Sequence, residues 1–374
     1  MAVRSTSARV RVLAPAGVYL AVRLTGVAVL AVLTGGDPVP ALRSWDGDWL
    51  LAIAQYGYAG VPADHLDAFG HHTPYSALGF FPGYPTAAGL LAPLIGTTAA
   101  GLLVSLVAGV AAAYALARLG ALVPGGSERA GVLLVALFAA APMGIVLSMA
   151  YTEALFSALA AWALVHVLQR NWIAAGAFAA AAGIVRPTSA AVVAAVGLAA
   201  FVAIARREDG LRPWLGGALA ASGLLGYLGA VALVTGRVDG WSAIQRDGWG
   251  WYVDGGVSTA QFLAGAVSGG SRIYDLAIVL GFVASLVLLG LLIRMRMPWP
   301  VVTYSAVLLV TVWCSAGLDY AKLRLLVPAF PLLLPVALGL AARRTGTAVA
   351  VACGAALASA WFGAYALTIW QFGI

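Results

Sequence analysis

The sequence contains little charge. Only 9% of its 374 residues are charged and 62% are hydrophobic, whereas about a quarter of the residues in a soluble domain carry charge. A chain with so few charged side chains cannot cover its surface in water, which excludes an ordinary soluble protein. The chain also lacks a polar linker between its apolar stretches. We therefore predict a single membrane domain over residues 1–374.

Cysteine and lysine are scarce as well. Cys314 and Cys353 stand in apolar surroundings, without the paired spacing of a zinc site or a disulfide framework. All but one of the 21 basic residues are arginine, and with the bias towards Ala, Gly and Val this suggests a bacterial, GC-rich genome. The first apolar run has no small-residue cleavage site before Asp37, so we expect a span there rather than a cleaved signal peptide.

Apolar runs of about 18 residues or more recur along the chain, and a helix needs this length to cross a bilayer. We predict about eleven spans and therefore an all-α, polytopic transmembrane helical bundle. The runs on either side of Arg186 are short for spans and suit broken or re-entrant helices. The predicted spans are 12–34, 97–118, 130–148, 154–169, 172–185, 188–205, 214–235, 273–293, 299–317, 325–342 and 347–370.

The arginines indicate the orientation, because short cytoplasmic loops retain basic residues. Every second predicted turn is basic, which leaves two long extracytoplasmic loops at 35–96 and 236–272. Most carboxylates and three of the four histidines then lie outside. We expect an integral protein of a bacterial plasma membrane whose active site, if it has one, faces outside. The cytoplasmic residues are Arg118, Arg129, Arg170, Arg206, Arg207, Arg212, Arg294, Arg296, Arg343 and Arg344, with Arg4, Arg9 and Arg11 before the first span.

An acidic pair, Asp46 and Asp48, follows the first span and is flanked by Trp45 and Trp49. The apolar positions that come next suit a short amphipathic helix on the membrane surface. A carboxylate in such a place can act as a general base. Either aspartate can equally be the cap of the helix that follows, and the residues alone leave both interpretations open.

Glu153 falls in a very short external turn, where a carboxylate near the membrane is costly and marks a candidate functional site. A first-turn charge on the next helix is the alternative. Tyr151 beside it suits either a hydrogen bond to a sugar or the interfacial aromatic belt. Arg186 lies in an apolar region next to Pro187, which favours a role in holding a phosphate. A structural pair with Glu153 or Asp46 is its alternative.

Lys322 and Arg324 precede the predicted span 325–342 and are further phosphate-binding candidates, although basic residues commonly snorkel at span ends. The acidic and histidine residues of the first external loop match no compact ligand spacing, so we predict no metal site. A divalent cation is not indicated, and metal dependence stays open. These loop residues are Asp64, His65, Asp67, His71 and His72.

Six segments, in order, resemble motifs of the PIG-V family of dolichol-phosphate-mannose-dependent mannosyltransferases and its bacterial relatives. The first is WDGDWLLAIAQYGY at 45–58. Ser189 departs from the pattern, since the family usually has Gly there. The other segments are FFPGYP at 80–85, SMAYTEALF at 148–156, GIVRPT at 183–188, WSAIQRDGWG at 241–250 and KLRLLVPAFP at 322–331.

The resemblance implies the GT-C fold, in which the first external loop carries short interfacial helices and an essential acidic residue. Asp46 would be the general base of an inverting displacement, with Asp48 and Glu153 as further catalytic carboxylates. The substrate-binding residues would be Trp45, Tyr151, Arg186, Gln245, Lys322 and Arg324.

The same resemblance implies a hexosyltransferase that takes a sugar, with mannose expected, from a polyprenyl-phosphate donor to a lipid or glycan acceptor. Its partners would be these substrates and membrane lipids, with no nucleic acid and no certain cofactor. A polytopic transporter or flippase is the main alternative, because charged groups inside a bundle also mark substrate paths. A glycosyltransferase of the same fold class with another donor sugar, and a non-catalytic assembly subunit, are the others.

Overall fold

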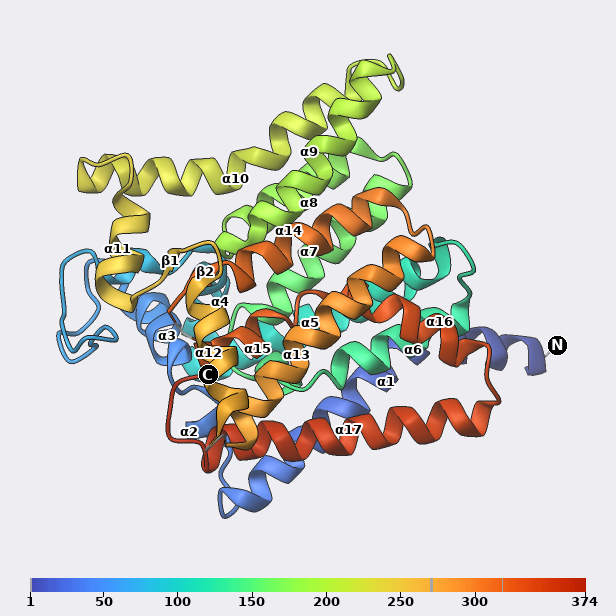
Figure 1. Ribbon diagram of the computed structural model, residues 1–374, viewed down its shortest axis with the longest axis horizontal. Helices are drawn as coiled ribbons and strands as arrows, with labels where there is room; N and C mark the ends of the chain where they lie inside the picture. The colour runs from blue at the N-terminus through green and yellow to red at the C-terminus, as the bar shows by residue number, and fades with distance from the viewer. Residues whose placement is uncertain (1, 270–271, 318) are drawn as a thin grey trace.

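The computed structural model describes residues 2–269, 272–317 and 319–374, with side chains from residue 12 onward. Within these ranges the chain is built from helices, as predicted, together with one short antiparallel ribbon in which β1 (Tyr252–Val253) pairs with β2 (Ser315–Ala316) (Figure 1). The ribbon was not expected from the apolar pattern. The α-helices are α1 (Ala2–Leu33), α2 (Val39–Leu42), α3 (Asp46–Tyr56), α4 (Gly83–Ile95), α5 (Thr97–Leu122), α6 (Glu128–Ala139), α7 (Glu153–Leu168), α8 (Trp172–Gly183), α9 (Ala190–Ala205), α10 (Arg212–Thr235), α11 (Gly240–Trp249), α12 (Val257–Ser268), α13 (Ile273–Arg294), α14 (Trp299–Trp313), α15 (Lys322–Leu325), α16 (Leu334–Ala341) and α17 (Thr345–Thr368).

Six described helices are long and apolar enough to cross a membrane, which supports an integral membrane protein. The bent pair Asp319–Leu325 and Phe330–Ala341 adds a seventh if it is counted as one span. Helices also lie at the other predicted spans, but they are shorter, so the expected eleven full-length spans are not all present. The six are Val12–Leu33, Thr97–Leu122, Pro187–Ala205, Arg212–Thr235, Ile273–Arg294 and Thr345–Thr368, and the shorter apolar helices are Glu153–Leu168, Trp172–Gly183 and Trp299–Trp313.

Proline accounts for two of the shortened helices. The predicted span 130–148 stops being α-helical at Ala139, three residues before Pro142, and resumes as the 3-10 helix η2 (Gly144–Ser148). The predicted span 325–342 is bent by 67° between its two helices, where Pro328 lies. Proline has no N–H to donate and its ring clashes with the preceding turn, so neither helix continues through it. These breaks leave polar backbone inside the bundle.

Helices α8, α9 and α10 project together from the rest of the molecule (Figure 1). Glycines allow α10 to pack closely on α8: a Cβ atom at Gly216 would lie 2.3 Å from the carbonyl oxygen of Trp172, and one at Gly223 would lie 1.9 Å from that of Ala180. Small residues let membrane helices approach in this way. The close packing of α10 on α8 fixes the position of the break between α8 and α9, where Arg186 lies.

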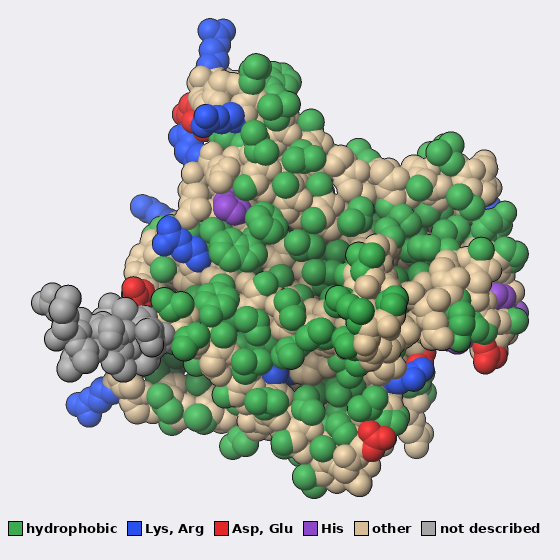
Figure 2. All heavy atoms as spheres, turned by 180° about the vertical axis from the view of Figure 1, so that it is seen from behind, with side chains coloured by type: hydrophobic (Ala, Val, Ile, Leu, Met, Phe, Trp, Pro, Cys, Tyr) green, Lys and Arg blue, Asp and Glu red, His purple; other side chains and the backbone are tan. Residues whose placement is uncertain are grey.

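The two ends of the molecule differ in character. The short helices α2, α3, α4, α11 and α12 and the β1–β2 ribbon gather at one end, on the left of Figure 1. Most of the basic side chains visible in Figure 2 lie along the opposite end, and a broad apolar surface separates the two. This distribution agrees with the predicted topology, in which the loops 35–96 and 236–272 share one face of the membrane.

Candidate functional site

Asp46 begins helix α3, directly after a residue with an unusual backbone. Trp45, at the N-cap position, has φ of 59° and ψ of −121° and makes no side-chain cap bond. Non-glycine residues rarely adopt a positive φ, and such conformations concentrate at functional sites. Asp46 and Asp48 both lie in the first turn of α3, so the structure gives neither the N-cap position considered above. The buried face of α3, which includes Trp49 and Leu50, fixes this turn against the bundle.

Four charged side chains from different parts of the chain form one group, namely Asp46, Glu153, Arg186 and Arg324. Arg324, on α15, places its Nη1 atom 2.8 Å from Oδ2 of Asp46 and its Nε atom 3.4 Å from Oε1 of Glu153. The same Glu153 oxygen lies 2.9 Å from Nη1 of Arg186. Glu153 therefore links the two arginines. The structural pair with Glu153, considered above for Arg186, is formed, and the group includes Asp46 as well.

This charged group is largely withdrawn from water. Glu153 is 1% exposed and Arg324 4% exposed, whereas the side chain of Asp46 is 37% exposed. Oε2 of Glu153 and Nε of Arg186 have no hydrogen-bond partner among the described residues. Buried charges need pairing and full hydrogen bonding to offset their desolvation, so this group retains capacity for an anionic or polar ligand.

Aromatic rings support the two arginines. The guanidinium of Arg324 lies 5.0 Å from the ring centre of Tyr151, and that of Arg186 lies 5.8 Å from the ring centre of Phe156. Tyr151 also donates a hydrogen bond of 3.1 Å from its hydroxyl to the carbonyl of Ser44. The predicted Tyr151 thus contacts both the phosphate-binding candidate and the segment that leads to Asp46.

A cavity opens beside these residues. Five of the predicted site residues line it, and apolar side chains form much of the remaining wall. Its predicted members are Asp46, Tyr151, Arg186, Gln245 and Arg324, and its apolar members include Leu50, Phe81, Val185, Val312 and Leu325.

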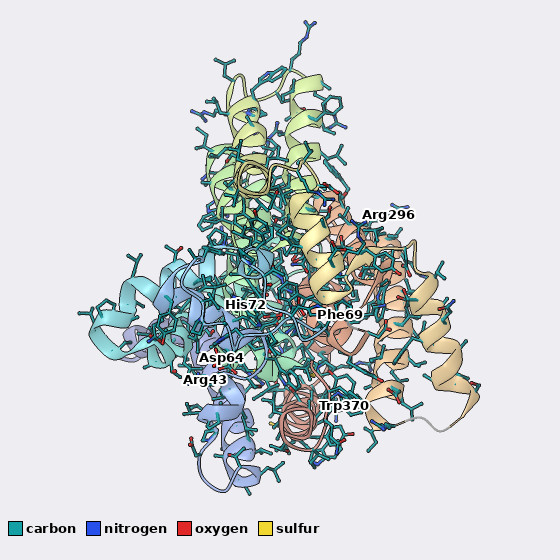
Figure 3. All side chains as sticks on the ribbon, turned by 90° about the vertical axis from the view of Figure 1, so that its left-hand side faces the viewer. Arg43, Asp64, Phe69, His72, Arg296 and Trp370 are labelled. Atoms are coloured by element: carbon teal, nitrogen blue, oxygen red, sulfur yellow. The ribbon has the colours of Figure 1, made fainter. Side chains whose placement is uncertain are left out.

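A second cavity meets the first at Asp46, Arg324 and Trp249, which line both. It is the more polar of the two and contains the predicted residues Trp45 and Asp48. Oδ1 of Asp48 lies 3.0 Å from Nε of Arg43 in an exposed pair. Seen from the end that bears the short helices, Arg43, Asp64 and His72 lie over the middle of the molecule, where the loop 35–96 covers the bundle (Figure 3). Asp46 therefore faces two compartments.

An aromatic wall joins the two long loops, 35–96 and 236–272. Trp249 packs with ring centres 5.8 Å from Trp49 and 5.5 Å from Phe80. Gln245 donates from Nε2 to the carbonyl of Gly79 at 2.8 Å, and a Cβ atom on Gly79 would lie 3.0 Å from the Trp249 ring. The sequence did not lead us to assign Trp249, Phe80 or Gly79 to the site. Trp249 and Phe80 lie inside the motif segments 241–250 and 80–85, so the resemblance could have indicated them.

Lys322 does not line the cavities described above. It is 1% exposed, and its Nζ atom lies 2.8 Å from Oδ1 of Asp319 and donates to the hydroxyl of Thr259. Thr259 in turn donates to the carbonyl of Trp313 at 2.8 Å. Lys322 therefore connects α12 to the end of α14, close to the β1–β2 ribbon. The structure places this predicted residue where it supports the loop 236–272.

Asp254 anchors the same loop outside the membrane spans. Its carboxylate accepts hydrogen bonds from the Ser258 hydroxyl, from the Ser258 backbone N–H at 2.7 Å and from the Gly256 N–H at 2.8 Å. These bonds lower the pKa of Asp254 to about 2. The backbone of Asp254 also donates to the carbonyl of Cys314 at 3.1 Å, which fixes the start of α12 beside the ribbon.

The acidic and histidine residues of the first loop have local partners. Asp67 accepts from the backbone N–H groups of Phe69 and His71, each at 2.9 Å, and so closes a turn. His65 lies 3.2 Å from Asp64. Across the described residues, no group of three His, Cys, Asp or Glu side chains is placed to hold a metal ion.

No family model matches the sequence, and no curated protein does either. Among solved structures, the chain is similar to ArnT from Cupriavidus metallidurans, whose crystal structure is bound to undecaprenyl phosphate, with 15% identity and a TM-score of 0.51. The similarity covers 88% of this chain and 63% of the ArnT chain, so this chain spans less than two thirds of that protein. At this level of identity the likeness concerns the fold, and the chain has the polytopic helical fold of the GT-C type.

Proposed function

We propose that this protein is a membrane glycosyltransferase that takes a sugar, with mannose as the expected donor residue, from a polyprenyl phosphate to a hydroxyl acceptor outside the cytoplasm. The observation that carries the proposal is the meeting of Asp46 with Arg186 and Arg324 at a cavity with apolar walls. A polyprenyl-phosphate sugar has an anionic group beside a hydrocarbon tail, and such a cavity offers both complements. The undecaprenyl phosphate in the ArnT crystal structure is consistent with this donor class.

The two arginines are the proposed phosphate ligands. Guanidinium groups bind phosphate oxygens through short, charge-assisted hydrogen bonds, and Glu153 holds both arginines by one carboxylate oxygen. The phosphate would compete with Asp46 for Arg324. Donor binding would thereby release the aspartate from its ion pair at the moment when a base is needed.

Asp46 is the proposed general base. It accepts the proton of the acceptor hydroxyl as the acceptor oxygen forms a bond to the anomeric carbon. The bond between that carbon and the phosphate oxygen breaks, polyprenyl phosphate leaves with the electron pair, and the configuration inverts. Because Asp46 lines both cavities, the acceptor would approach from the polar side while the donor occupies the apolar side. Asp48 and Trp45, in the polar cavity, are proposed to assist acceptor binding.

The proposal is tested by incubating purified protein with polyprenyl-phosphate mannose, and separately with the arabinose and glucose analogues, in the presence of extracted membrane lipids and glycans. Mass spectrometry should show an acceptor that gains one sugar and an equal amount of free polyprenyl phosphate. A product from another donor alone would replace mannose and keep the reaction class. Movement of the intact donor across proteoliposomes without a sugar-bearing product would favour the transporter alternative and reject the transferase.

A further inference from the structure

Arg23 is a buried arginine in the middle of the first span. It is 4% exposed, and α1 crosses the membrane region from Val12 to Leu33 around it. A charge at this depth is costly unless protein groups satisfy it. None of the described carboxylates forms an ion pair with Arg23, and its Nη1 atom donates instead to the backbone carbonyl of Gly144. The residue is therefore committed to a backbone partner.

The carbonyl of Gly144 belongs to residues 140–152, which connect α6 to α7 and are here called the unwound segment. Backbone without regular α-helical bonding is tolerated at membrane depth only where surrounding protein satisfies it. Three further side chains donate to its carbonyls, one from α1 itself and two from other helices. These bonds are Ser359 Oγ to Ala141 at 2.6 Å, Tyr19 hydroxyl to Leu147 at 3.4 Å and Ser105 Oγ to Met149 at 2.6 Å, with Tyr19 on α1, Ser359 on α17 and Ser105 on α5.

Two glycines make room for this arrangement. A Cβ atom on Gly144 would lie 3.2 Å from Nη2 of Arg23 and 3.2 Å from Oγ of Ser359, so a side chain there would crowd both donors. A Cβ atom on Gly363 would lie 2.6 Å from that of Ile145, so α17 approaches the unwound segment closely only because position 363 is glycine. Helices α1 and α17 therefore both pack against the unwound segment and hold it in place.

The unwound segment leads directly to the candidate site. The Ala150 N–H donates to the carbonyl of Leu42 at 2.9 Å, and the Tyr151 hydroxyl donates to that of Ser44 at 3.1 Å. These two bonds tie the segment to the residues just before Asp46. At this same end the segment runs into Glu153, the first residue of α7. A shift of the segment would move both carboxylates.

We propose that Arg23 is a positioning residue which, by holding the unwound segment at Gly144, fixes Glu153 and Asp46 relative to each other. Its effect on catalysis rests on the transferase function proposed above, whereas its hold on the segment does not. A small displacement of a reacting group lowers the rate of the chemical step strongly. Loss of Arg23 should therefore reduce kcat more than it raises the KM for the donor.

The test compares Arg23→Leu and Arg23→Lys with the wild-type protein in lipid nanodiscs. Hydrogen exchange followed by mass spectrometry is recorded for peptides covering 140–152, with α9 as an internal reference. We expect Arg23→Leu to raise exchange in 140–152 by about tenfold, as loss of a charged hydrogen bond implies, while α9 is unchanged. Arg23→Lys should give an intermediate increase. The control Thr25→Val removes a hydroxyl that bonds only within α1, to the carbonyl of Ala21, and should change neither region.

The kinetic arm uses the same proteins with polyprenyl-phosphate mannose and the acceptor identified in the transfer assay. Arg23→Leu should lower kcat by about tenfold or more with the donor KM within about twofold of wild type, and Arg23→Lys should recover part of the loss. If Arg23→Leu does not fold, Ser359→Ala supplies the test, since it removes one bond to the segment and leaves the arginine in place.

Unchanged exchange in 140–152 of a folded Arg23→Leu protein would overturn the inference, and so would increased exchange with an unchanged kcat. A wild-type protein that transfers no sugar would instead reject the proposed function, and the exchange arm would then still decide whether Arg23 holds the segment.

Discussion

Arg324 and Asp46 form an ion pair of 2.8 Å between α15 and the first turn of α3, residues separated by most of the chain. The arginine side chain is 5% exposed and the aspartate 37%, so the pair joins the interior of the bundle to the two cavities. Arg324 occupies one oxygen of Asp46, and a bound phosphate that engages the arginine would free this oxygen. The arrangement favours a reaction order in which the anionic donor binds first.

Arg186→Gln should weaken donor binding. The guanidinium is a proposed phosphate ligand, and removing a charged hydrogen-bonding group typically costs about 1.5–3 kcal/mol, which corresponds to an increase in donor KM of roughly tenfold to a hundredfold. The measurement is the donor KM at saturating acceptor. Arg237→Gln is the matched control, because Arg237 pairs with Asp239 at 2.8 Å on the exposed surface. An unchanged donor KM in Arg186→Gln would remove this residue from the phosphate site.

The same substitution should also destabilise the protein, because it leaves Glu153 buried beside a neutral partner. Removing one member of a buried ion pair commonly costs about 3–5 kcal/mol, although Arg324 still lies 3.4 Å from Glu153 and should reduce this loss. The double variant Arg186→Gln with Glu153→Gln should recover thermal stability without recovering transfer. Recovery of both properties would assign the pair a purely structural role.

Gly79→Ala should disturb the aromatic wall. Its added methyl group would lie 3.0 Å from the Trp249 ring and 3.1 Å from Nε2 of Gln245, closer than such contacts normally allow. We expect kcat/KM to fall by about tenfold. Gly197→Ala on α9 is the control, since nothing lies within 4 Å of its added methyl group, and it should keep full activity. Equal activities of the two variants would contradict a role for this wall.

The anchor of the second external loop should weaken in acid. Hydrogen bonding lowers the pKa of Asp254 to about 2, below its ordinary value of about 3.9. The folded state therefore favours the charged carboxylate, and the stability this contributes is complete above pH 4 or so and is lost as the pH falls through about 2. Asp254→Asn should flatten the dependence of the unfolding temperature on pH between about 5 and 2, and Ser258→Ala should do so in part. The same slope in Asp254→Asn and wild type would contradict the assignment.

The orientation in the membrane has its own test. In a background without the two native cysteines, single cysteines at 64 and 247 should react with an impermeant maleimide added outside intact cells. Cysteines at 124 and 295, in the basic turns, should react only after permeabilisation. The reversed pattern would place the proposed site in the cytoplasm and exclude the predicted topology.

Much of the fold follows from simple properties of the sequence. Apolar runs predict the helical bundle, and the arginine pattern predicts the grouping of the two long loops. The lengths of individual spans were wrong where helices break, because a hydropathy window averages across residues such as Pro142 and Pro328. The β1–β2 ribbon escaped prediction because two-residue strands carry no periodic signal.

The candidate site shows the same division. Ordered motifs brought Asp46, Glu153, Arg186 and Arg324 forward, and the structure brings these four together. The sequence does not indicate that Lys322 is buried against Thr259, because that contact depends on how the second loop folds back. Arg23 is a lone charge in the first predicted span, which by itself marks a candidate functional residue. Its partner could not be predicted, because a backbone carbonyl gives no signal in the pattern of side chains.

The central claim is that Asp46 is the base of a sugar transfer from a polyprenyl phosphate. The most direct measurement is the initial rate of product formation by Asp46→Asn, compared with wild type and with Asp37→Asn, which alters another carboxylate of the first external loop. We predict a loss of about 10²–10⁴-fold for Asp46→Asn, in the range typical of a general base, in a protein that still folds and inserts into the membrane, and near-normal rates for Asp37→Asn. An Asp46→Asn protein that transfers sugar at the wild-type rate would contradict it.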